Sequence, residues 1–392
     1  MAPKAETLLA HLGRDPSAQH GAVNPPVYHA STILYETVDS LLNDTKPLRQ
    51  GATQYGRAGT PTTFALESAV AELEGGFGAM AMPSGLAAIS GALLSILKTG
   101  DHLLMADTVY YPTRALCKDI LTGYGVQVDY FDPLVGGDVH HLIRDNTRAI
   151  FVESPGSLTF EVQDIPAIAQ VAQQSGVLVM ADNTWASPLY CNPLALGADL
   201  VVHAGTKYIV GHSDAMLGLI VAKTEALYTA VRLRTQRMGY TTGPDDLYLG
   251  LRGLRTLSVR LERHFQSALT LASWLQEQDA VSRVLYPALP DDPGHALWQR
   301  DFSGASGLLG LVLKPASKQA VAAFLEDLEL FAMGYSWGGY ESLLIPTFPE
   351  TCRSATTWAP EGPCLRMHVG LEDPSDLRDD LTAGFARLRK TS

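Results

Sequence analysis

The sequence is poor in the residues that build disulfide scaffolds, zinc sites and nucleic-acid surfaces. Only 4 of its 392 residues are cysteine, and none forms a Cys-x-x-Cys pair, which argues against a disulfide framework or a zinc knuckle. The 29 Lys and Arg residues are outnumbered by 41 Asp and Glu residues, which gives a net charge of −12. Because nucleic-acid backbones are bound chiefly by clustered basic residues, we expect no nucleic-acid partner.

Long hydrophobic runs are also missing. The longest apolar stretch, Ser84 to Leu97, is shorter than the ~20 residues that a bilayer-spanning helix needs, and it contains glycines and serines. Charged residues such as Lys4 and Glu6 interrupt the N-terminal segment, so no signal-peptide core is present there. We therefore predict a cytoplasmic protein with no membrane partner, whose cysteines are reduced and mostly buried.

Metal and dinucleotide motifs are absent as well. The 11 histidines include no His-Glu-x-x-His, and His140-His141 is interpreted as a pair in a loop, so no metal site is predicted. Gly75-Gly76-Phe77-Gly78 lacks the preceding strand and the spacing of a dinucleotide fingerprint and is interpreted as a turn.

The hydrophobic pattern predicts an α/β fold. An apolar run at 149–152 is followed by a helical pattern from Ile165 to Gln174, with Asp164 as its N-cap, and by a second apolar run at 177–181. A third run follows at 200–202. Continuous apolar strands that alternate with helices are typical of a mostly parallel sheet covered by helices on both faces.

The C-terminal part is expected to be a smaller α+β domain. One long helix is predicted from about Gly250 to Gln278, where large apolar residues recur every four positions, and this helix is a candidate to join two domains. Beyond it, the patterns predict strands at 307–313 and 364–369 and a helix at 318–328.

Polar residues follow each apolar run of the predicted parallel sheet. Glu153 comes after the first, Asp182-Asn183-Thr184 after the second, and His203-Ala204-Gly205-Thr206-Lys207 after the third. Ligands of such sheets bind outside the carboxyl ends of the strands. A carboxylate and a later lysine suit pyridoxal phosphate, which needs a Schiff-base amine and an anion beside its pyridinium nitrogen. Asp182 and Lys207 are therefore the predicted cofactor residues.

A candidate anion site precedes a further helical pattern. Pro83-Ser84-Gly85-Leu86 stands where the free N–H groups and the dipole of a helix suit a phosphate. A Ser-Gly turn serves more often as a plain helix cap, so these residues alone favour the cap.

The segment from Asp199 to Ser213, which contains Lys207, resembles the lysine signature of the Cys/Met-metabolism family of pyridoxal-phosphate enzymes. The resemblance covers nearly the whole chain, from Tyr55-Gly56-Arg57 to Val369-Gly370-Leu371-Glu372. It implies the pyridoxal-phosphate-dependent transferase fold of type I, which is aspartate aminotransferase-like.

The resemblance also implies a domain plan and an assembly. Residues 1–57 are expected to form an arm that contacts a neighbouring subunit, 58–253 the cofactor-binding domain, and 254–392 the C-terminal domain. The implied assembly is a homotetramer, a dimer of dimers with shared active sites.

Two stretches, Gly211 to Met216 and Tyr335 to Leu343, are similar to the family branch that performs α,β-elimination on L-cystathionine, a step of methionine biosynthesis. Relatives that act at the γ-carbon usually carry Leu where this chain has Trp337. The alternatives are a γ-lyase or γ-synthase of the same family, a cysteine or cystine desulfhydrase, and a noncatalytic regulator. Pro112, two positions after Tyr110, argues against the methionine γ-lyases, which usually carry cysteine there.

The family likeness assigns roles around the cofactor. Lys207 carries it and Asp182 faces its ring nitrogen. A ring from Tyr110 stacks on the cofactor, with Tyr111 as the local competitor. The phosphate is held by Ser84, Gly85, Leu86 and Thr206 and, from a neighbouring subunit, by Tyr55 and Arg57.

The family likeness also assigns the substrate side. Lys207, assisted by Tyr110, is the expected proton carrier. Arg366 is expected to bind the substrate α-carboxylate through its planar guanidinium, and Ser336, Trp337 and Tyr55 complete the substrate residues. Two positions depart from the pattern: Ala204 stands where many relatives have a phosphate-binding serine, and Ala58 where some β-lyases have a second arginine. We expect Ala204 to affect cofactor affinity, and Ala58 to affect the preference for cystathionine over smaller cysteine derivatives.

Overall fold

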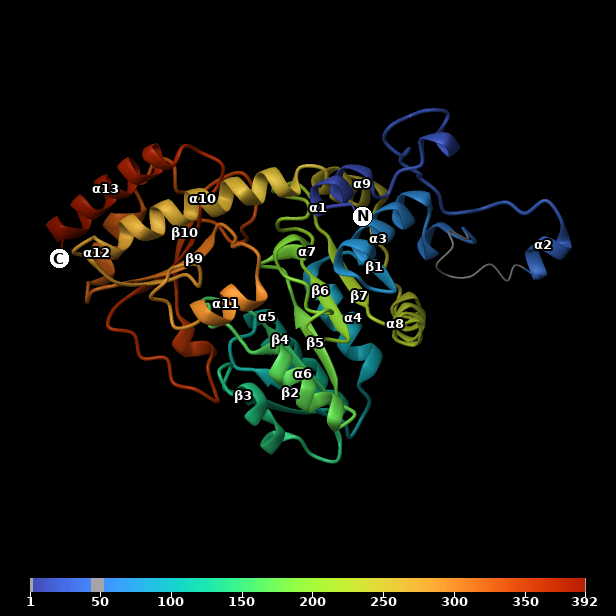
Figure 1. Cartoon of the computed structure of the whole chain (residues 1–392), viewed down its shortest axis with the longest axis horizontal. Coiled ribbons are helices and arrows are strands. Elements are labelled where there is room, and N and C mark those ends of the chain that lie inside the picture. Colours follow the sequence, from blue (N-terminus) through green and yellow to red (C-terminus); the bar gives the residue numbers. More distant parts are fainter. Residues whose placement is uncertain (1–2, 44–52, 392) are drawn as a thin grey trace.

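A seven-stranded sheet organises the larger part of the molecule. The structure, a computed structural model, describes residues 3–43 and 53–391, and Figure 1 labels its elements. The strands lie in the order β1-β7-β6-β5-β4-β2-β3. Their bounds are β1 Gly78–Met82, β2 His102–Ala106, β3 Gln127–Phe131, β4 Thr147–Glu153, β5 Leu178–Asp182, β6 Leu200–His203 and β7 Gly218–Ala222. β7 runs antiparallel to β1 and β6 while the other pairs are parallel, so the predicted mostly parallel sheet is confirmed.

The central β4-α6-β5 unit follows the sequence pattern closely. Helix α6 spans Ile165–Gln174, as predicted. The side chain of Asp164 accepts a hydrogen bond from the backbone N–H of Ala167 at 3.1 Å, which confirms the N-cap. Gly176 follows the helix with a φ of +66°, a left-handed conformation that favours glycine. Local capping and the hydrophobic period therefore agree here.

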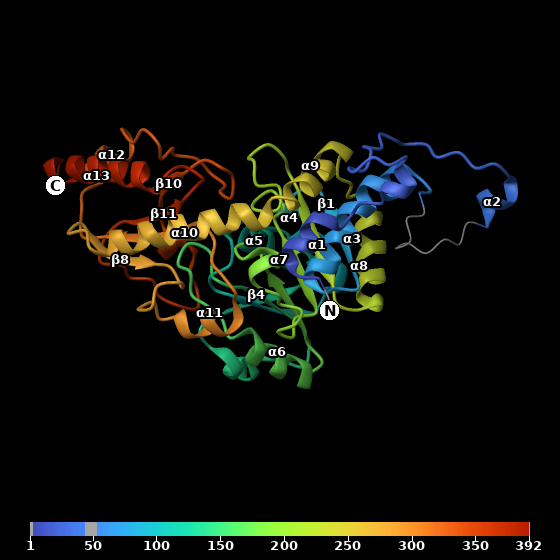
Figure 2. The same ribbon diagram turned by 45° about the horizontal axis from the view of Figure 1, so that its top comes forward.

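Helices cover both faces of this sheet (Figures 1 and 2). On β6, Leu200 and Val202 join a core with residues of α4 and α8, whereas Val201 joins a second core with residues of α3 and α9. The bounds are α3 Pro61–Glu74, α4 Gly85–Ile96, α8 Glu225–Arg237 and α9 Pro244–Leu254. Alternate side chains of a strand point to opposite faces, so each face of the sheet has its own core.

The predicted long helix that ends near Gln278 is confirmed as α10 (Leu257–Gln276), but its expected start near Gly250 is wrong, because a separate helix, α9, occupies the residues up to Leu254. The N–H groups of Arg255 and Thr256 bond to carbonyls three residues back, which tightens and ends α9. The Arg260 guanidinium also donates to the Gly253 carbonyl at 2.8 Å. The apolar spacing continues across this break, which is why the pattern alone did not reveal it.

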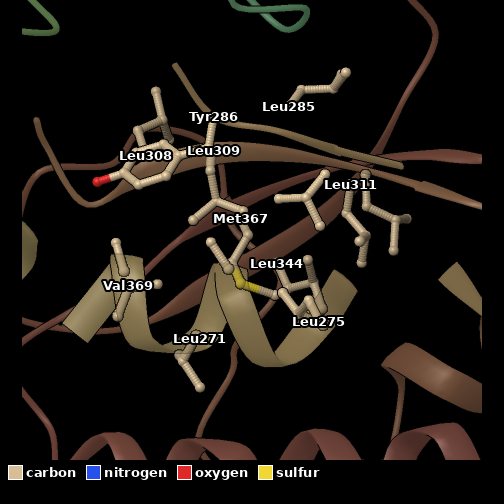
Figure 3. Close-up of a cluster of buried hydrophobic side chains, with 14 of the residues drawn as sticks. Leu271, Leu275, Leu285, Tyr286, Leu308, Leu309, Leu311, Leu344, Met367 and Val369 are labelled. Carbon is tan, nitrogen blue, oxygen red and sulfur yellow. The ribbon is translucent and has the colours of Figure 1, made fainter. Parts of the chain in front are cut away.

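A four-stranded antiparallel sheet forms the C-terminal part, in the order β10-β11-β9-β8. Leu271 and Leu275 of α10 pack against this sheet in one core with Leu344 and Met367 (Figure 3). The elements are β8 Val281–Leu285, β9 Leu308–Leu313, β10 Leu343–Thr347, β11 Cys364–His368, α12 Lys318–Leu325 and α13 Pro374–Thr391. The predicted strands near 307 and 364 and the helix near 318 are confirmed.

The N-terminal segment has two parts that pack differently. Helix α1 (Ala5–His11) packs against the body of the molecule, where the Arg255 guanidinium donates to the Leu9 carbonyl at 2.7 Å. Helix α2 (Val38–Leu42) instead lies on a segment that extends away from the body (Figures 1 and 2), and Val38 and Leu42 are 71% and 74% exposed. Residues 44–52 of the predicted arm lie outside the described residues.

The remaining short helices are α5 Tyr111–Leu116, α7 Ser187–Tyr190 and α11 His295–Asp301.

Among the described residues, no helix combines the length and apolar character needed to cross a bilayer. All four cysteines are free, and Cys352 is the one that is partly exposed while the other three are buried.

Candidate active site

A cavity of about 230 Å³ lies at the carboxyl edge of the large sheet. Strands β4 and β5 bring Glu153 and Asp182 to it, and the turns after β6 bring Lys207. Trp337 and Arg366 close the cavity from the C-terminal part. The other residues lining it are Ser84, Gly85, Leu86, Ile89, Tyr110, Pro155, Gly156, Ser157, Leu158, Phe160, Thr184, Trp185, Ala204, Thr206, Met216 and Leu308.

The Lys207 amine is the main nucleophilic group of this cavity. Its Nζ donates a hydrogen bond to Ser336 Oγ at 2.5 Å. Burial, followed by the positive charge of Arg366, lowers the pKa of Lys207 to about 8, whereas the Asp182 carboxylate acts in the opposite direction. A substantial fraction of the amine is therefore neutral near neutral pH, which suits a nucleophile or a base.

Two carboxyl groups stand beside each other at the strand ends, where Glu153 pairs in register with Asp182. Asp182 Oδ1 accepts hydrogen bonds from the N–H and the hydroxyl of Thr184, at 2.9 and 2.5 Å. Glu153 Oε2 accepts one from the Tyr110 N–H at 2.7 Å. Burial raises the pKa of both carboxyls, and the charge of Asp182 raises the pKa of Glu153 further. We therefore assign the negative charge to Asp182 and a proton to Glu153.

The start of α4 offers the donors that the predicted anion site requires. Ser84 is its N-cap and accepts from the Ala87 N–H at 3.1 Å, while Gly85 and Leu86 supply N–H groups of the first turn. A Cβ on Gly85 would come within 2.5 Å of the Ala204 side chain, so only glycine fits this close approach. Thr206 Oγ1 lines the same cavity, although it already bonds with the backbone of Leu217.

This donor set fits pyridoxal phosphate. The cavity offers a lysine amine of lowered pKa, a carboxylate for a cationic ring nitrogen and helix N–H groups for a phosphate. Both hydrogen bonds that Asp182 accepts from described residues end on Oδ1, so Oδ2 remains for a ligand donor.

Tyr110 lines the cavity and Tyr111, the alternative weighed from the sequence, does not. Tyr110 immediately precedes α5, and its backbone is fixed by the hydrogen bond to Glu153. Partial burial raises the pKa of the Tyr110 phenol, so the ring is neutral at physiological pH.

The C-terminal part contributes Ser336, Trp337 and Arg366. Arg366 lies on β11, and its Nη2 donates to the Ser336 carbonyl at 2.9 Å. The Trp337 ring centroid lies 5.2 Å from Lys207 Nζ. The structure therefore brings these three predicted substrate residues to Lys207.

Tyr55 and Arg57 lie outside this chain's cavity. Tyr55 is 49% exposed, and Arg57 donates to the Gln236 carbonyl at 2.6 Å. Their expected role at a neighbouring subunit's phosphate remains a prediction.

Sequence reasoning gave no role to several residues of the site. The sequence marks Glu153 as a strand-end carboxylate without giving it a role, and it marks Thr184, which holds Asp182, only as a neighbour of that residue. Position directly after a predicted strand was the signal for both. Leu158 and Phe160, which have positive φ angles of 69° and 61°, had no such signal.

Within residues 3–43 and 53–391, one group of potential metal ligands lies on the surface. Ligand atoms of Asp138, His140 and His141 lie within 4.8 Å of one another, and all three residues are exposed. The two histidines belong to a 3-10 helix, Gly136–Leu142, rather than to the loop that the sequence suggested. None of the three lines the cavity.

Comparisons with known proteins identify a family model and several relatives that match nearly the whole chain. Residues 6–386 match the model of the family described as Cys/Met metabolism PLP-dependent enzyme. Cystathionine beta-lyase of Salmonella typhimurium is 43% identical over 98% of both chains. Cystathionine beta-lyase of Escherichia coli is 42% identical over 98% of this chain and 99% of the relative.

Two further comparisons widen the range of activities. An L-alanine/L-glutamate racemase of Wolbachia pipientis is 39% identical over 98% of both chains. The crystal structure of a cystathionine gamma synthase from Xanthomonas oryzae matches with a TM-score of 0.91 at 30% identity over 100% of both chains. Likeness of fold therefore does not separate these reactions, and residues of the site must do so.

Proposed function

Because this chain belongs to the Cys/Met metabolism family of PLP-dependent enzymes, we propose that it is a carbon–sulfur β-lyase that converts L-cystathionine to homocysteine, pyruvate and ammonia, a step of methionine biosynthesis. The observation that carries the proposal is a single cavity that holds the Lys207 amine, the Asp182 carboxylate and the Arg366 guanidinium together with Trp337. Cystathionine beta-lyases among the relatives at 42% and 43% identity support it.

The large sheet would hold the cofactor. Lys207 would attach pyridoxal phosphate covalently, Asp182 would pair with its ring nitrogen, and Tyr110 would stack on the ring. Ser84, Gly85, Leu86 and Thr206 would hold the phosphate. When bound, this cofactor supplies an electron sink that stabilises negative charge at the substrate Cα.

The C-terminal part would orient the substrate. Arg366 binds the α-carboxylate with two parallel N–H donors. Lys207 Nζ, whose pKa is about 8, then accepts the Cα proton and returns a proton to the leaving homocysteine sulfur, with Tyr110 beside it. Trp337 limits the space next to Lys207. The substrate is thereby oriented so that its carbon–sulfur bond at Cβ, rather than the one at Cγ, is broken.

We also propose a cytoplasmic homotetramer with shared active sites. Exposed apolar residues of the arm, such as Leu34 at 89% exposure, suit burial against another copy. The four free cysteines suit a reducing compartment. If Arg57 acts in a neighbouring cavity, mixing inactive Lys207→Ala and Arg57→Ala subunits restores activity. Sedimentation analysis of the mixture gives the number of subunits.

Identification of the keto acid formed from L-cystathionine tests the reaction. Pyruvate with homocysteine, detected by mass spectrometry, is the expected result. 2-Oxobutyrate with cysteine would instead place the chain among the γ-lyases. Reaction with cystine or cysteine alone would indicate a desulfhydrase, and no keto acid from any of them would contradict a lyase.

Racemisation is a second candidate function, favoured by the Wolbachia relative. A racemase must remove a proton from one face of Cα and return it to the other. Lys207 and Tyr110 both line the cavity and both carry exchangeable protons. Chiral analysis of L-alanine incubated with the enzyme in deuterated water tests this activity. A Tyr110→Phe variant should lose racemisation to a greater extent than β-elimination.

A further inference from the structure

The loop formed by residues 336–341 is in close contact with Lys207. Ser336 and Gly338 have φ angles of +77° and +88°, so the chain turns sharply here. A Cβ on Gly338 would lie 3.0 Å from the Lys207 Cα and carbonyl carbon, which shows how closely the two backbones approach. This contact places the Ser336 hydroxyl at 2.5 Å from Lys207 Nζ.

Such a loop needs partners that fix it, and β11 supplies two of them. Arg366 and His368 are two residues apart on this strand, so their side chains share one face of the sheet. Arg366 donates to the Ser336 carbonyl at 2.9 Å. The His368 ring bonds to two further backbone groups of the loop.

The hydrogen bonds of His368 determine its protonation. Nδ1 lies 3.0 Å from the Glu341 carbonyl oxygen, which can only accept, so Nδ1 carries the proton. Nε2 lies 3.1 Å from the Gly338 N–H, which can only donate, so Nε2 carries none. The ring therefore acts in one neutral tautomer and bridges both ends of the 338–341 segment.

The surroundings of His368 favour this neutral form. The residue is 1% exposed, and burial together with the neighbouring His264 lowers its pKa well below the usual value. The rings of His264 and Tyr208 lie 5.2 and 6.1 Å from its ring. If Nε2 were protonated, its N–H and the Gly338 N–H would both be donors, and the hydrogen bond between them would be lost.

The geometry points to His368 as a positioning residue that supports substrate binding through the 336–341 loop. Its two hydrogen bonds hold Ser336 and Trp337 against Lys207 without contact between the imidazole and the reacting atoms. The inference rests on the proposed β-lyase function, because the loop positions substrate residues of that reaction.

Three variants test the inference. His368→Phe keeps a ring of similar size but removes both hydrogen bonds, and His368→Asn retains one amide donor as a partial rescue. His264→Phe is the control, since His264 is equally buried and bonds to the Val369 carbonyl rather than to the loop. Amide hydrogen exchange of 336–341 is measured on the holoenzyme without substrate, and kcat and KM are measured with L-cystathionine.

His368→Phe should speed amide exchange of the loop about tenfold and raise KM about tenfold, with a smaller change in kcat. His368→Asn should fall between wild type and His368→Phe. His264→Phe should lower thermal stability while loop exchange and KM stay near wild type.

Equal behaviour of His368→Phe and His264→Phe would overturn the inference, as would faster loop exchange with an unchanged KM. Failure of the proposed function is a separate result. Wild-type enzyme that forms no pyruvate from L-cystathionine rejects the lyase, whereas the exchange of the loop still decides whether His368 holds it.

Discussion

The two walls of the cavity are built in different ways. The cofactor wall comes from the large sheet, where Asp182 ends β5 and Lys207 follows β6 within a few residues. The substrate wall comes from the C-terminal part, where Ser336 and Trp337 sit on a loop held by the side chains of β11. One wall is fixed by neighbouring strands, and the other by contacts between distant segments.

This difference predicts different consequences of substitution. Strand ends are anchored by ladder hydrogen bonds, so a change on the cofactor wall removes a chemical group and leaves the geometry in place. A loop held by side chains can shift when one support is lost. Substitutions on the cofactor wall should therefore abolish chemistry, whereas those on the substrate wall should mainly alter affinity and selectivity.

The largest effect is expected at Lys207. Lys207→Ala removes both the attachment amine and the proton carrier, so kcat should fall about 10⁴-fold or more. The visible absorbance of covalently attached cofactor should disappear as well. Lys223→Ala, which changes an exposed lysine outside the cavity, is the control and should retain both. Turnover of the Lys207→Ala variant above about a tenth of wild type would contradict the assignment of Lys207 as attachment amine and proton carrier.

The two strand-end carboxyls provide the second test. Asp182→Asn removes the anion and should lower kcat/KM about 10²-fold to 10³-fold. Glu153→Gln replaces a protonated carboxyl by a neutral amide of similar shape and should change kcat/KM by about threefold or less. The paired measurement is steady-state kinetics with L-cystathionine. The reverse order of effects would show that the negative charge resides on Glu153.

The contrast between the walls also explains what the sequence revealed. Asp182 and Lys207 were found because parallel strands bring their carboxyl ends to one edge, and α6 was found with correct bounds because its period and cap agree. The support of the 336–341 loop by His368 was not found. Its hydrogen bonds join residues 30 and 27 positions apart, and no local pattern marks them.

The same reasoning accounts for the error at α9 and α10. Apolar residues recur at helical spacing across Arg255 and Thr256, so the period continues where the helix does not. The break depends on Arg260, whose guanidinium bonds to the carbonyls of Gly253 and Tyr208. Tertiary contacts of this kind override a continuous helical pattern.

Trp337 tests the selectivity of the substrate wall. Trp337→Leu opens space beside Lys207, so kcat/KM for cystathionine β-elimination should fall about tenfold. The share of 2-oxobutyrate among the keto acids should rise at the same time. Trp358→Leu, at a tryptophan that bonds to Cys364 Sγ outside the cavity, should leave the product ratio unchanged. If Trp337→Leu still forms pyruvate as its sole keto acid, Trp337 does not determine which carbon–sulfur bond is broken.

The smallest expected effect is a pH shift that tests how the walls interact. Cofactor uptake by the apoenzyme requires neutral Lys207, so its rate should rise with pH and level off above a midpoint of about 8. Burial is the main cause of this lowered pKa, and the Arg366 cation adds to it. Arg366→Gln removes the second cause together with the hydrogen bond to the Ser336 carbonyl, and the midpoint should move upward while remaining below 10.5, the ordinary value for lysine. Stopped-flow absorbance of pyridoxal phosphate binding measures both midpoints. A midpoint near 10.5 in the wild type would contradict burial of the amine, whereas equal midpoints in wild type and variant would show that the substrate wall does not influence Lys207 electrostatically.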